Sequence, residues 1–490
     1  MIVFQPRKKW LSCLVVWFTS CFFSQAIFSL TVSGKAVDLE GQPVPFVRIT
    51  VSGEELVPAT TSVFTSPNGT FSTSLKNTKA DGLKVDSFRI GWEEIERNVS
   101  VEDKGIGYQF ILGKKENVAD QVPSSAWIPG TPGDRKYHIL INECAGCHQL
   151  GAERVKRFAE SLSPLNDEAK ELAWDAMVQY MRVRALRMGP AGHTELRWGL
   201  TEDSPDYKGA ISPPTSFFLP RDVEVIVPFL AEEFPTKFDT MTGYDDIDKL
   251  GEYGVTEGTI VEEYQLPTFG WTREVSIAPG SDRVWFLELD GDRLGALNKS
   301  DGTVEWFDVP GEGPQGPHTL NADSKGNLWV ALEESYSMAR FNTKTYQWKV
   351  FGPPEGVKFA ITHDAALNSK RQVEPDDKGR LWLTLVGLNE LWSIHTETGE
   401  VKRYKMPLPQ GEEEFHVFIY GAAMDPNGKR VWWTQLHGFL GSFNTETERV
   451  ERIVEFPRGA APRRMAIEKD GTLWVPLYGE GQLVKFDTKK

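Results

Sequence analysis

Hydrophobic and polar residues follow two different periods along this chain, and the change of period divides it into segments. Between Leu30 and about Lys114, short runs in which apolar and polar residues alternate are separated by turn-forming sequences; the runs are LTVSGKAV, PFVRITV, GTFSTSL, SFRI and YQFIL. A period of two is typical of half-buried β-strands. The pattern therefore predicts an all-β module over residues 30–114.

Residues 136–240 change to helical spacing. Apolar positions recur at i, i+3, i+4 and i+7 in a first run, at Tyr137, Leu140, Ile141 and Cys144. A second helix is predicted to begin at Asn166, with Asp167 and Glu168 in a first turn that favours carboxylates. Its apolar face carries Trp174, Val178, Met181 and Ala185. A third helix is predicted from Asp222 to before Pro235, with a kink at Pro228. Residues 115–135 are rich in proline and polar side chains, which predicts a linker.

The remaining segment, residues 255–490, contains a sequence repeat that begins at about Thr259. Its anchors are five tryptophans spaced by 44, 53, 50 and 42 residues, at Trp285, Trp329, Trp382, Trp432 and Trp474. Each anchor follows a turn and precedes a second strand, and a third run follows in four of the five repeats. Four short strands at this period are typical of a β-propeller blade. Five blades are detected, and six or seven are not excluded.

The fifth repeat ends at Lys490 without its outer strand. The run TIVEEYQLP at residues 259–267 matches the outer strands of the other repeats. We therefore expect this run to close the ring and to remove the exposed sheet edges.

The first 26 residues have the pattern of a secretory signal peptide. Arg7, Lys8 and Lys9 precede an apolar stretch from Trp10 to Phe23, and small residues stand at Ser24 and Ala26. The predicted cleavage follows Ala26, with an uncleaved anchor or a lipoprotein site at Cys21 as the alternatives. We expect an exported chain, periplasmic or secreted, with no transmembrane helix.

Charge and size narrow the function further. Loss of residues 1–26 removes three positive charges, so that the formal net charge of −15 becomes −18. Nucleic acid and anionic membranes are poor partners for such a chain. The 464 remaining residues suggest roughly three domains.

The sequence CAGCH at residues 144–148 carries the clearest chemistry. Cys13 and Cys21 leave with the signal peptide, so Cys144 and Cys147 are the only cysteines that remain. A structural zinc site needs a second pair of ligands, and a redox dithiol needs a thioredoxin-like context. C-x-x-C-H is the attachment signature of one covalent haem c, with His148 as an axial iron ligand. A redox-active disulfide is the alternative.

The first module resembles the carboxypeptidase regulatory-like domain. The match lies in VSGKAVDLEGQPVPFVRITVSG and FTSPNGTFSTSL, at Gly34, Gly41, Pro43, Gly69 and Phe71. The resemblance implies a small transthyretin-like or Ig-like β-sandwich over residues 30–114 that stabilises or docks and is not catalytic.

Residues 136–240 resemble a class I cytochrome c domain, through CxxCH, W-x-x-x-V-x-x-M and a final helix that ends in Phe-Pro. The resemblance implies a small α-helical domain in which His148 is the proximal ligand and a downstream methionine the distal one. Met181 is the first choice because it shares a helix face with Trp174. Met188, Met177 and His193 compete for this role.

The repeat resembles the virginiamycin B lyase (streptogramin lyase) propellers, through PHTLNADSKGNLWVALEES. The resemblance implies a base at His318 and a Mg²⁺-binding carboxylate at Glu333. Gly316 occupies the position of the second carboxylate, and the final blade has Arg463 where the family's matching residue lies. Calcium is possible in a propeller, but no D-x-D-x-D-G run demands it.

The start of each innermost strand is expected to border the central channel. These positions hold Arg273, His318, His363, Tyr420 and Arg463. A channel mouth rich in His and Arg suits an anionic or metal-bound ligand. The alternative is that they are ordinary strand-end polar groups.

These features favour an exported c-type cytochrome fused to a propeller that binds a redox partner protein or a small anionic ligand. It would act in electron transfer or as part of an oxidoreductase. A metal-dependent lyase and a non-catalytic haem sensor are the alternatives.

Overall fold

The protein is described by a computed structural model. The structure describes residues 29–54, 56–76, 82–98, 107–115, 118, 121, 136, 139–140, 153–187, 220–232, 258–267, 272–289, 291–353, 357, 361–386, 389–408, 419–436, 438–457, 460, 462–478 and 482–489. Only the backbone is described for residues 29, 153–156, 180–187, 220–222 and 361–363.

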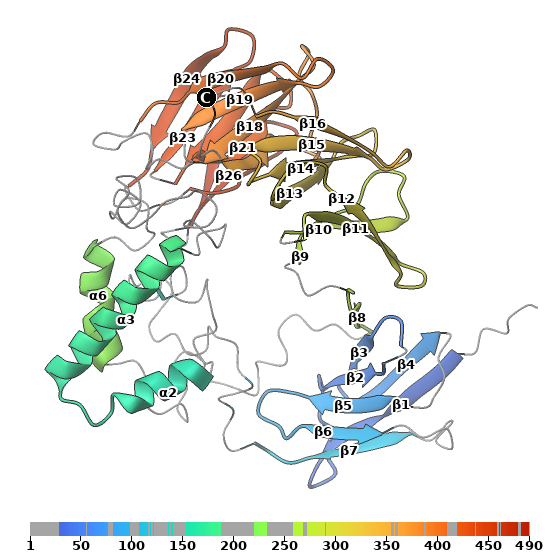
Figure 1. Cartoon of the computed structure of the whole chain (residues 1–490). Coiled ribbons are helices and arrows are strands. Elements are labelled where there is room, and N and C mark those ends of the chain that lie inside the picture. The colour runs from blue at the N-terminus through green and yellow to red at the C-terminus, as the bar shows by residue number, and fades with distance from the viewer. Residues whose placement is uncertain are drawn as a thin grey trace, which may run out of the picture.

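The first module consists of two β-sheets that share one apolar core (Figure 1). Its strands are β1 (Ser29–Asp38), β2 (Arg48–Ser52), β3 (Thr60–Phe64), β4 (Thr70–Lys76), β5 (Lys84–Phe88), β6 (Ile95–Asn98) and β7 (Tyr108–Leu112). One sheet has the order β4-β1-β7, and the other begins β6-β5-β2-β3. The alternating runs correctly predicted five of these strands, and β3 and β6 were not predicted.

The core of this module explains why two sheets form. Ile49 and Val51 of β2, Val85 of β5 and Phe110 of β7 are each 0% exposed. These strands place every second side chain between the sheets, where apolar area is removed from water. The result is a β-sandwich.

Three described helices follow the sandwich: α2 (Glu153–Ser161), α3 (Asp167–Arg187) and α6 (Pro220–Glu232). The predicted start of α3 is confirmed, because Asn166 Oδ1 accepts a hydrogen bond of 2.9 Å from the Ala169 amide. Helix α6 begins two residues before the predicted start and contains Pro228. Helix α2 was not predicted.

One apolar cluster joins these helices. Trp174 and Val178 of α3 are buried with Ile226 and Phe229 of α6. The Phe158 ring packs edge-on against Trp174 with ring centroids 5.0 Å apart. The cluster also buries Ile139 and Leu140, which belong to the first predicted helical run.

Among the described residues, no helix is both long and apolar enough to cross a bilayer.

Two residues of the predicted linker are fixed to neighbouring elements. Gln121 is buried, donates from Nε2 to the Trp92 carbonyl at 2.8 Å and accepts from the Gly91 amide at 3.0 Å. Val118 and Ile90 pack against the helical cluster. At these points the chain joins the sandwich to the helices.

The C-terminal region consists of five antiparallel sheets in chain order, which is the arrangement of propeller blades (Figure 1). Blades 1 and 2 contain β9 (Thr272–Ser276), β10 (Arg283–Glu288), β11 (Arg293–Asn298), β12 (Val304–Asp308), β13 (Pro317–Ala322), β14 (Asn327–Leu332), β15 (Ser337–Asn342) and β16 (Gln347–Phe351). Blades 3 and 4 contain β17 (Ile361–Ala365), β18 (Arg380–Val386), β19 (Glu390–His395), β20 (Val401–Lys405), β21 (Ile419–Met424), β22 (Arg430–Gln435), β23 (Phe439–Asn444) and β24 (Arg449–Glu455). Blade 5 contains β25 (Ala466–Ile467), β26 (Thr472–Leu477) and β27 (Gln482–Asp487). The five predicted repeats therefore correspond to five blades.

The anchor tryptophans are fixed by the turns that precede them. In blades 2, 3 and 5 the indole Nε1 donates a hydrogen bond to an acidic residue six positions earlier. The acceptors are Asp323, Asp376 and Glu468, at 3.1, 3.0 and 2.6 Å respectively. Ser281 has this role in blade 1, at 3.0 Å. In blade 4 one extra residue separates Asp425 from Trp432, whose indole nitrogen has no hydrogen-bond partner among the described residues.

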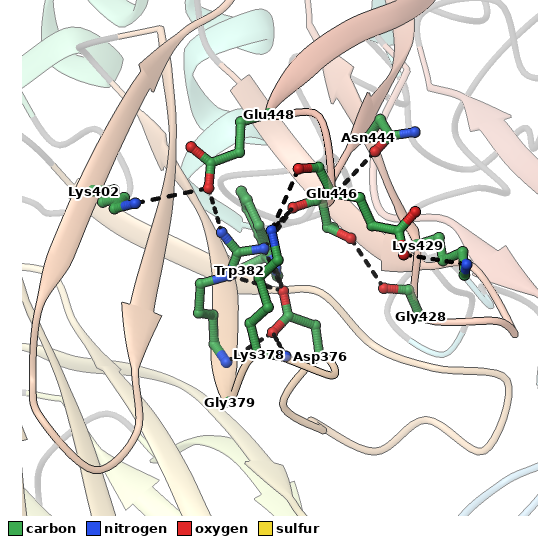
Figure 2. A network of polar contacts seen from close by, with 12 residues as sticks. Asp376, Lys378, Gly379, Trp382, Lys402, Gly428, Lys429, Asn444, Glu446 and Glu448 are labelled. Carbon is green, nitrogen blue, oxygen red and sulfur yellow. Dashed lines mark hydrogen bonds and ion pairs between the residues drawn. The ribbon is translucent and has the colours of Figure 1, made fainter.

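A polar network secures the outer part of the junction between blades 3 and 4 (Figure 2). Arg380 donates to Asp376 Oδ2 at 3.0 Å, to Glu448 Oε1 at 2.7 Å and to the Thr445 carbonyl at 2.6 Å. Lys402 Nζ lies 3.8 Å from Glu448 Oε1. The buried guanidinium thus connects the two blades.

The expected closing strand has a different partner. Residues Ile260–Glu263 form β8, which pairs with β3 and adds a fifth strand to the sandwich sheet. Thr60 Oγ1 donates to Glu263 Oε2 at 2.6 Å across this pair. The prediction that this run closes the propeller ring is therefore wrong for this structure. A strand with free backbone groups can complete any sheet edge within its reach.

Candidate functional site

The innermost strands bring one buried histidine and two charged groups together. His318 on β13 is 0% exposed, and its Nε2 lies 3.2 Å from Oε1 of Glu333, which follows β14. Arg273 of β9 contacts the same Nε2 atom. His318 Nδ1 lies 3.0 Å from the Thr319 hydroxyl. In this arrangement the imidazole is enclosed by protein groups.

A second cluster surrounds Arg464, which comes just before β25. Its Nε donates to both carboxylate oxygens of Asp364 at 2.9 Å, and Nη1 lies 3.1 Å from Glu274 Oε1. Its Nη2 reaches the Thr319 hydroxyl at 3.5 Å. Arg464 therefore links inner-strand residues of blades 1, 2, 3 and 5.

The environment of Arg464 keeps its charge. Burial alone would lower the pKa of Arg464, but the carboxylates of Asp364 and Glu274 raise it above its ordinary value. Glu274 Oε2 also accepts from the Leu320 amide at 3.1 Å. The Glu274 carboxylate is thus held by both a charge and a backbone donor.

Buried threonines on the second strands fix the inner strands of neighbouring blades. Thr384 Oγ1 accepts from the Asp364 amide at 3.2 Å and donates to the Tyr420 carbonyl at 2.6 Å. Thr434 repeats this pattern, accepting from Gly421 at 2.9 Å and donating to Arg463 at 3.2 Å. These bonds set the positions of Asp364, Tyr420 and Arg463.

Arg463 lies among aromatic rings. Its guanidinium carbon is 3.8 Å from the ring centroid of Tyr478 and 5.2 Å from that of Tyr420. Contacts of this kind are typical of cation–π attraction between a guanidinium and an aromatic face. Of the expected mouth residues, Arg273, His318, Tyr420 and Arg463 thus all lie on inner strands or next to one, while the side chain of His363 lies outside the described residues.

Sequence reasoning missed the ion-pair cluster. Glu274, Asp364 and Arg464 each stand one residue after an expected mouth position, namely Arg273, His363 and Arg463. Charged residues in adjacent pairs at equivalent points of three repeats were the available signal.

The described residues contain no group of three or more His, Cys, Asp or Glu side chains able to hold a metal ion. Glu333 lies beside His318, and Gly316 stands where the lyase pattern has a second carboxylate.

The predicted haem motif and most of its candidate ligands lie outside the described residues. This applies to Cys144, Cys147, His148, Met188 and His193. Met181 belongs to α3, but only its backbone is described.

Met177 is the candidate whose side chain is described. It is partly buried and packs against the cluster that contains Trp174. Residues 1–26, the predicted signal peptide, also lie outside the described residues.

No protein-family model and no curated protein matches this chain. Among solved structures, virginiamycin B lyase from Staphylococcus aureus is 18% identical over 48% of this chain and 75% of its own, with a TM-score of 0.37. A streptogramin B lyase is 23% identical over 47% of this chain and 70% of its own, with a TM-score of 0.37. A luciferin-regenerating enzyme is 13% identical over 45% of this chain and 73% of its own, with a TM-score of 0.32.

Proposed function

We propose that this protein is an exported c-type cytochrome that carries one covalent haem beside a β-propeller and acts in electron transfer. The observation that carries the proposal is CAGCH at residues 144–148, which holds the only cysteines left after removal of the predicted signal peptide. Two thiols and an imidazole at this spacing are the donor set for thioether attachment and axial ligation. Export to the periplasm supplies a compartment in which such thiols are managed.

Two described residues that precede the motif support this proposal. Leu140, four residues before Cys144, is buried in the cluster formed by α3 and α6. Lys136 Nζ lies 5.0 Å from the Phe229 ring centroid, so the approach to the motif contacts α6. An apolar setting would limit solvent access to a bound macrocycle. Haem bound at Cys144 and Cys147 would supply one-electron exchange at iron.

Met181 remains our choice for the distal ligand. It follows Trp174 and Val178 at helical spacing, and both of these side chains point into the apolar cluster. A thioether ligand raises the reduction potential of haem iron. Met177 packs against the same cluster and is the competing distal ligand whose side chain is described. Met188 and His193 are the other candidates for this role.

The propeller would bind the redox partner or a small anionic ligand. Arg273 and Arg463 lie at the inner strands, and Tyr478 holds the Arg463 guanidinium by its aromatic face. Arg273 and Arg463 stand at the mouth positions expected from the sequence, and a ligand carboxylate or phosphate would pair with guanidinium groups there.

Absorption spectra of the mature protein, expressed with cytochrome c maturation machinery, test this proposal. We expect covalently retained haem, a sharp reduced α-band and reversible cycling between ferric and ferrous iron. Met181→Ala should remove the methionine-to-iron charge-transfer band, whereas Met177→Ala, the matched control, should keep it.

Absence of covalent haem would refute the cytochrome. Loss of the charge-transfer band in Met177→Ala alone would move the ligand to Met177. Carbon monoxide binding to the reduced, unmodified protein would show an open coordination site and favour a sensor.

A lyase is the second candidate, because His318 and Glu333 lie 3.2 Å apart. In this reading His318 would abstract a proton α to a carbonyl, and Glu333 would help to hold a metal ion that supplies positive charge beside the substrate. The imidazole is fully buried, however, and contacts Arg273. Mg²⁺-dependent opening of a cyclic depsipeptide, lost in His318→Ala, would establish the lyase, and its absence would exclude it.

A further inference from the structure

The two ends of the blade series expose apolar side chains that the internal junctions bury. In blade 5 the second residue of the third strand, Leu483, is 63% exposed. Its counterparts in blades 1, 3 and 4 are each 0% exposed, namely Leu294, Leu391 and Leu440. Those leucines pack in cores shared with the following blade. Leu483 thus lacks the cover that the others have.

Blade 1 shows the complementary exposure. Val275 and Ile277 are both 63% exposed. Val275 pairs with the residue after the anchor tryptophan, as Leu320 does in blade 2. Leu320 is 2% exposed because the preceding blade covers it. The side of blade 1 that faces away from blade 2 is therefore an unmade blade junction.

The anchor tryptophans show the same difference between the internal blade junctions and the two ends of the series. In blades 1 to 4 the anchor is buried in a core shared with the next blade. Trp474 of blade 5 is only half-buried. The two ends nevertheless meet at the centre, where Arg464 of blade 5 lies 3.1 Å from Glu274 of blade 1.

The pairing register shows what completes blade 5. In blades 1, 3 and 4 the fourth residue of the third strand pairs with the residue five before a proline, as in Ala296↔Glu305, Ser393↔Lys402 and Ser442↔Arg452. The same register for residues 259–267, which end at Pro267, places Glu262 opposite Lys485. It also places Tyr264 opposite the exposed Leu483.

Both pairs are complementary. Opposite charges and apolar side chains that face each other across an antiparallel pair stabilise it. The second-residue pairs of the other blades are apolar as well, at Leu294↔Phe307, Leu391↔Tyr404 and Leu440↔Val454.

We propose that residues 259–267 form an exchangeable strand that pairs either with β3 of the sandwich or with β27 of blade 5. Pairing with β27 brings blade 5 onto blade 1. Only four residues separate Pro267 from Thr272 of β9, and a chain extends by at most about 3.6 Å per residue. Val275, Ile277, Leu483 and Trp474 are then buried in a fifth junction.

The exchange couples two modules. When the strand leaves the sandwich, the β3 edge at Thr60–Phe64 loses its partner and presents free backbone groups. Closing the propeller therefore opens a strand-docking edge on the sandwich.

Hydrogen exchange of the full, haem-loaded chain tests the proposal, with peptides that cover residues 60–64 and 482–487. Thr60→Val removes the hydrogen bond to Glu263 that only the β3 pairing makes. We expect about fivefold faster exchange in 60–64, with slower exchange in 482–487.

Reversing the charge of Glu262 tests the exchange in the opposite direction, by weakening the pairing with β27. Glu262→Lys places like charges opposite each other in the β27 pairing, so exchange in 482–487 should become faster while 60–64 becomes slower. Glu262→Lys/Lys485→Glu should restore both peptides to the wild-type rates, and Lys485→Glu alone should resemble Glu262→Lys.

Changes in 60–64 without a reciprocal change in 482–487 would overturn the proposal. Failure of the double variant to restore the rates would do so too. Protection of 482–487 that rises with protein concentration would also overturn it, by assigning the strand to a second copy of the chain.

Discussion

The junction between blades 3 and 4 differs from the two ends of the blade series, although the same type of strand builds both. At the junction Trp382 and Leu391 are buried in a core shared with blade 4, and Arg380 adds a polar connection outside it. At the ends Leu483 and Val275 are exposed, and the described link is the central Arg464–Glu274 pair. The comparison shows that blade sequence specifies a junction-forming surface even where the structure does not use it.

The largest effect should come from the anchor tryptophans. Trp382→Ala empties a fully enclosed site and should lower the free energy of unfolding by about 3–5 kcal/mol. Trp474→Ala, its counterpart at the end, should cost about 1–2 kcal/mol because the ring is only half-buried. Chemical unfolding followed by tryptophan emission measures both. Equal losses would mean that the fifth junction is formed in solution.

The next effect concerns the polar connection in Figure 2. Arg380→Met leaves the carboxylate of Asp376 buried without its cation and should cost about 3 kcal/mol. Lys402→Met removes only an exposed pair with Glu448 and should cost less than about 0.5 kcal/mol. A thermal scan of the two variants checks this order. Similar melting temperatures would show that Arg380 does not hold the junction.

A smaller effect is expected from the turns. Asp323→Ala in blade 2 removes the acceptor of the Trp329 indole and of two backbone amides, and should cost about 2 kcal/mol. Asp425→Ala in blade 4 is the control, because that carboxylate does not reach Trp432, and should cost about 1 kcal/mol. Urea titrations of both variants decide the matter, and a larger loss in Asp425→Ala would contradict the role of the indole bond.

The smallest expected effect is the pH dependence of the stability that Glu448 contributes at the junction between blades 3 and 4. Burial on its own raises the pKa of Glu448, but the nearby Tyr404 hydroxyl and the Arg380 guanidinium lower it below its ordinary value of 4.5. A carboxyl with a lowered folded pKa contributes its stability above the ordinary value and loses it as the pH falls further. We therefore expect Glu448→Gln to narrow the stability gap between pH 6 and pH 3. Parallel curves for the variant and the unmodified protein would exclude Glu448 as a contributor.

Local patterns were sufficient for much of the fold. Period-two runs located five sandwich strands, and the tryptophan repeat located five blades, because each strand must place alternate side chains in a core. The start of α3 followed from Asn166, since a cap acts on amides two or three residues away. Strands β3 and β6 and helix α2 escaped because their apolar patterns are short or irregular.

The candidate site was only partly readable. His318, Arg273 and Arg463 were expected at the inner strands, whereas the Arg464 contacts with Asp364 and Glu274 join residues 100 positions or more apart. No local pattern reports such a pairing. The proposed haem attachment at Cys144 and Cys147 and the proposed ligand His148 were predicted from sequence alone, because thioether attachment needs a fixed local spacing.

The sequence by itself determined five of the sandwich strands, the start of α3 and the blade repeat, and it carries the haem proposal for CAGCH, since each depends on residues that are near neighbours in the chain. Only the tertiary structure decided the partner of residues 260–263, which pair with β3 although their pattern matches an outer blade strand. The physical reason is that strand pairing uses backbone donors and acceptors that every residue except proline carries. Pattern therefore makes a segment a strand, and the sheet edge within its reach decides where it pairs.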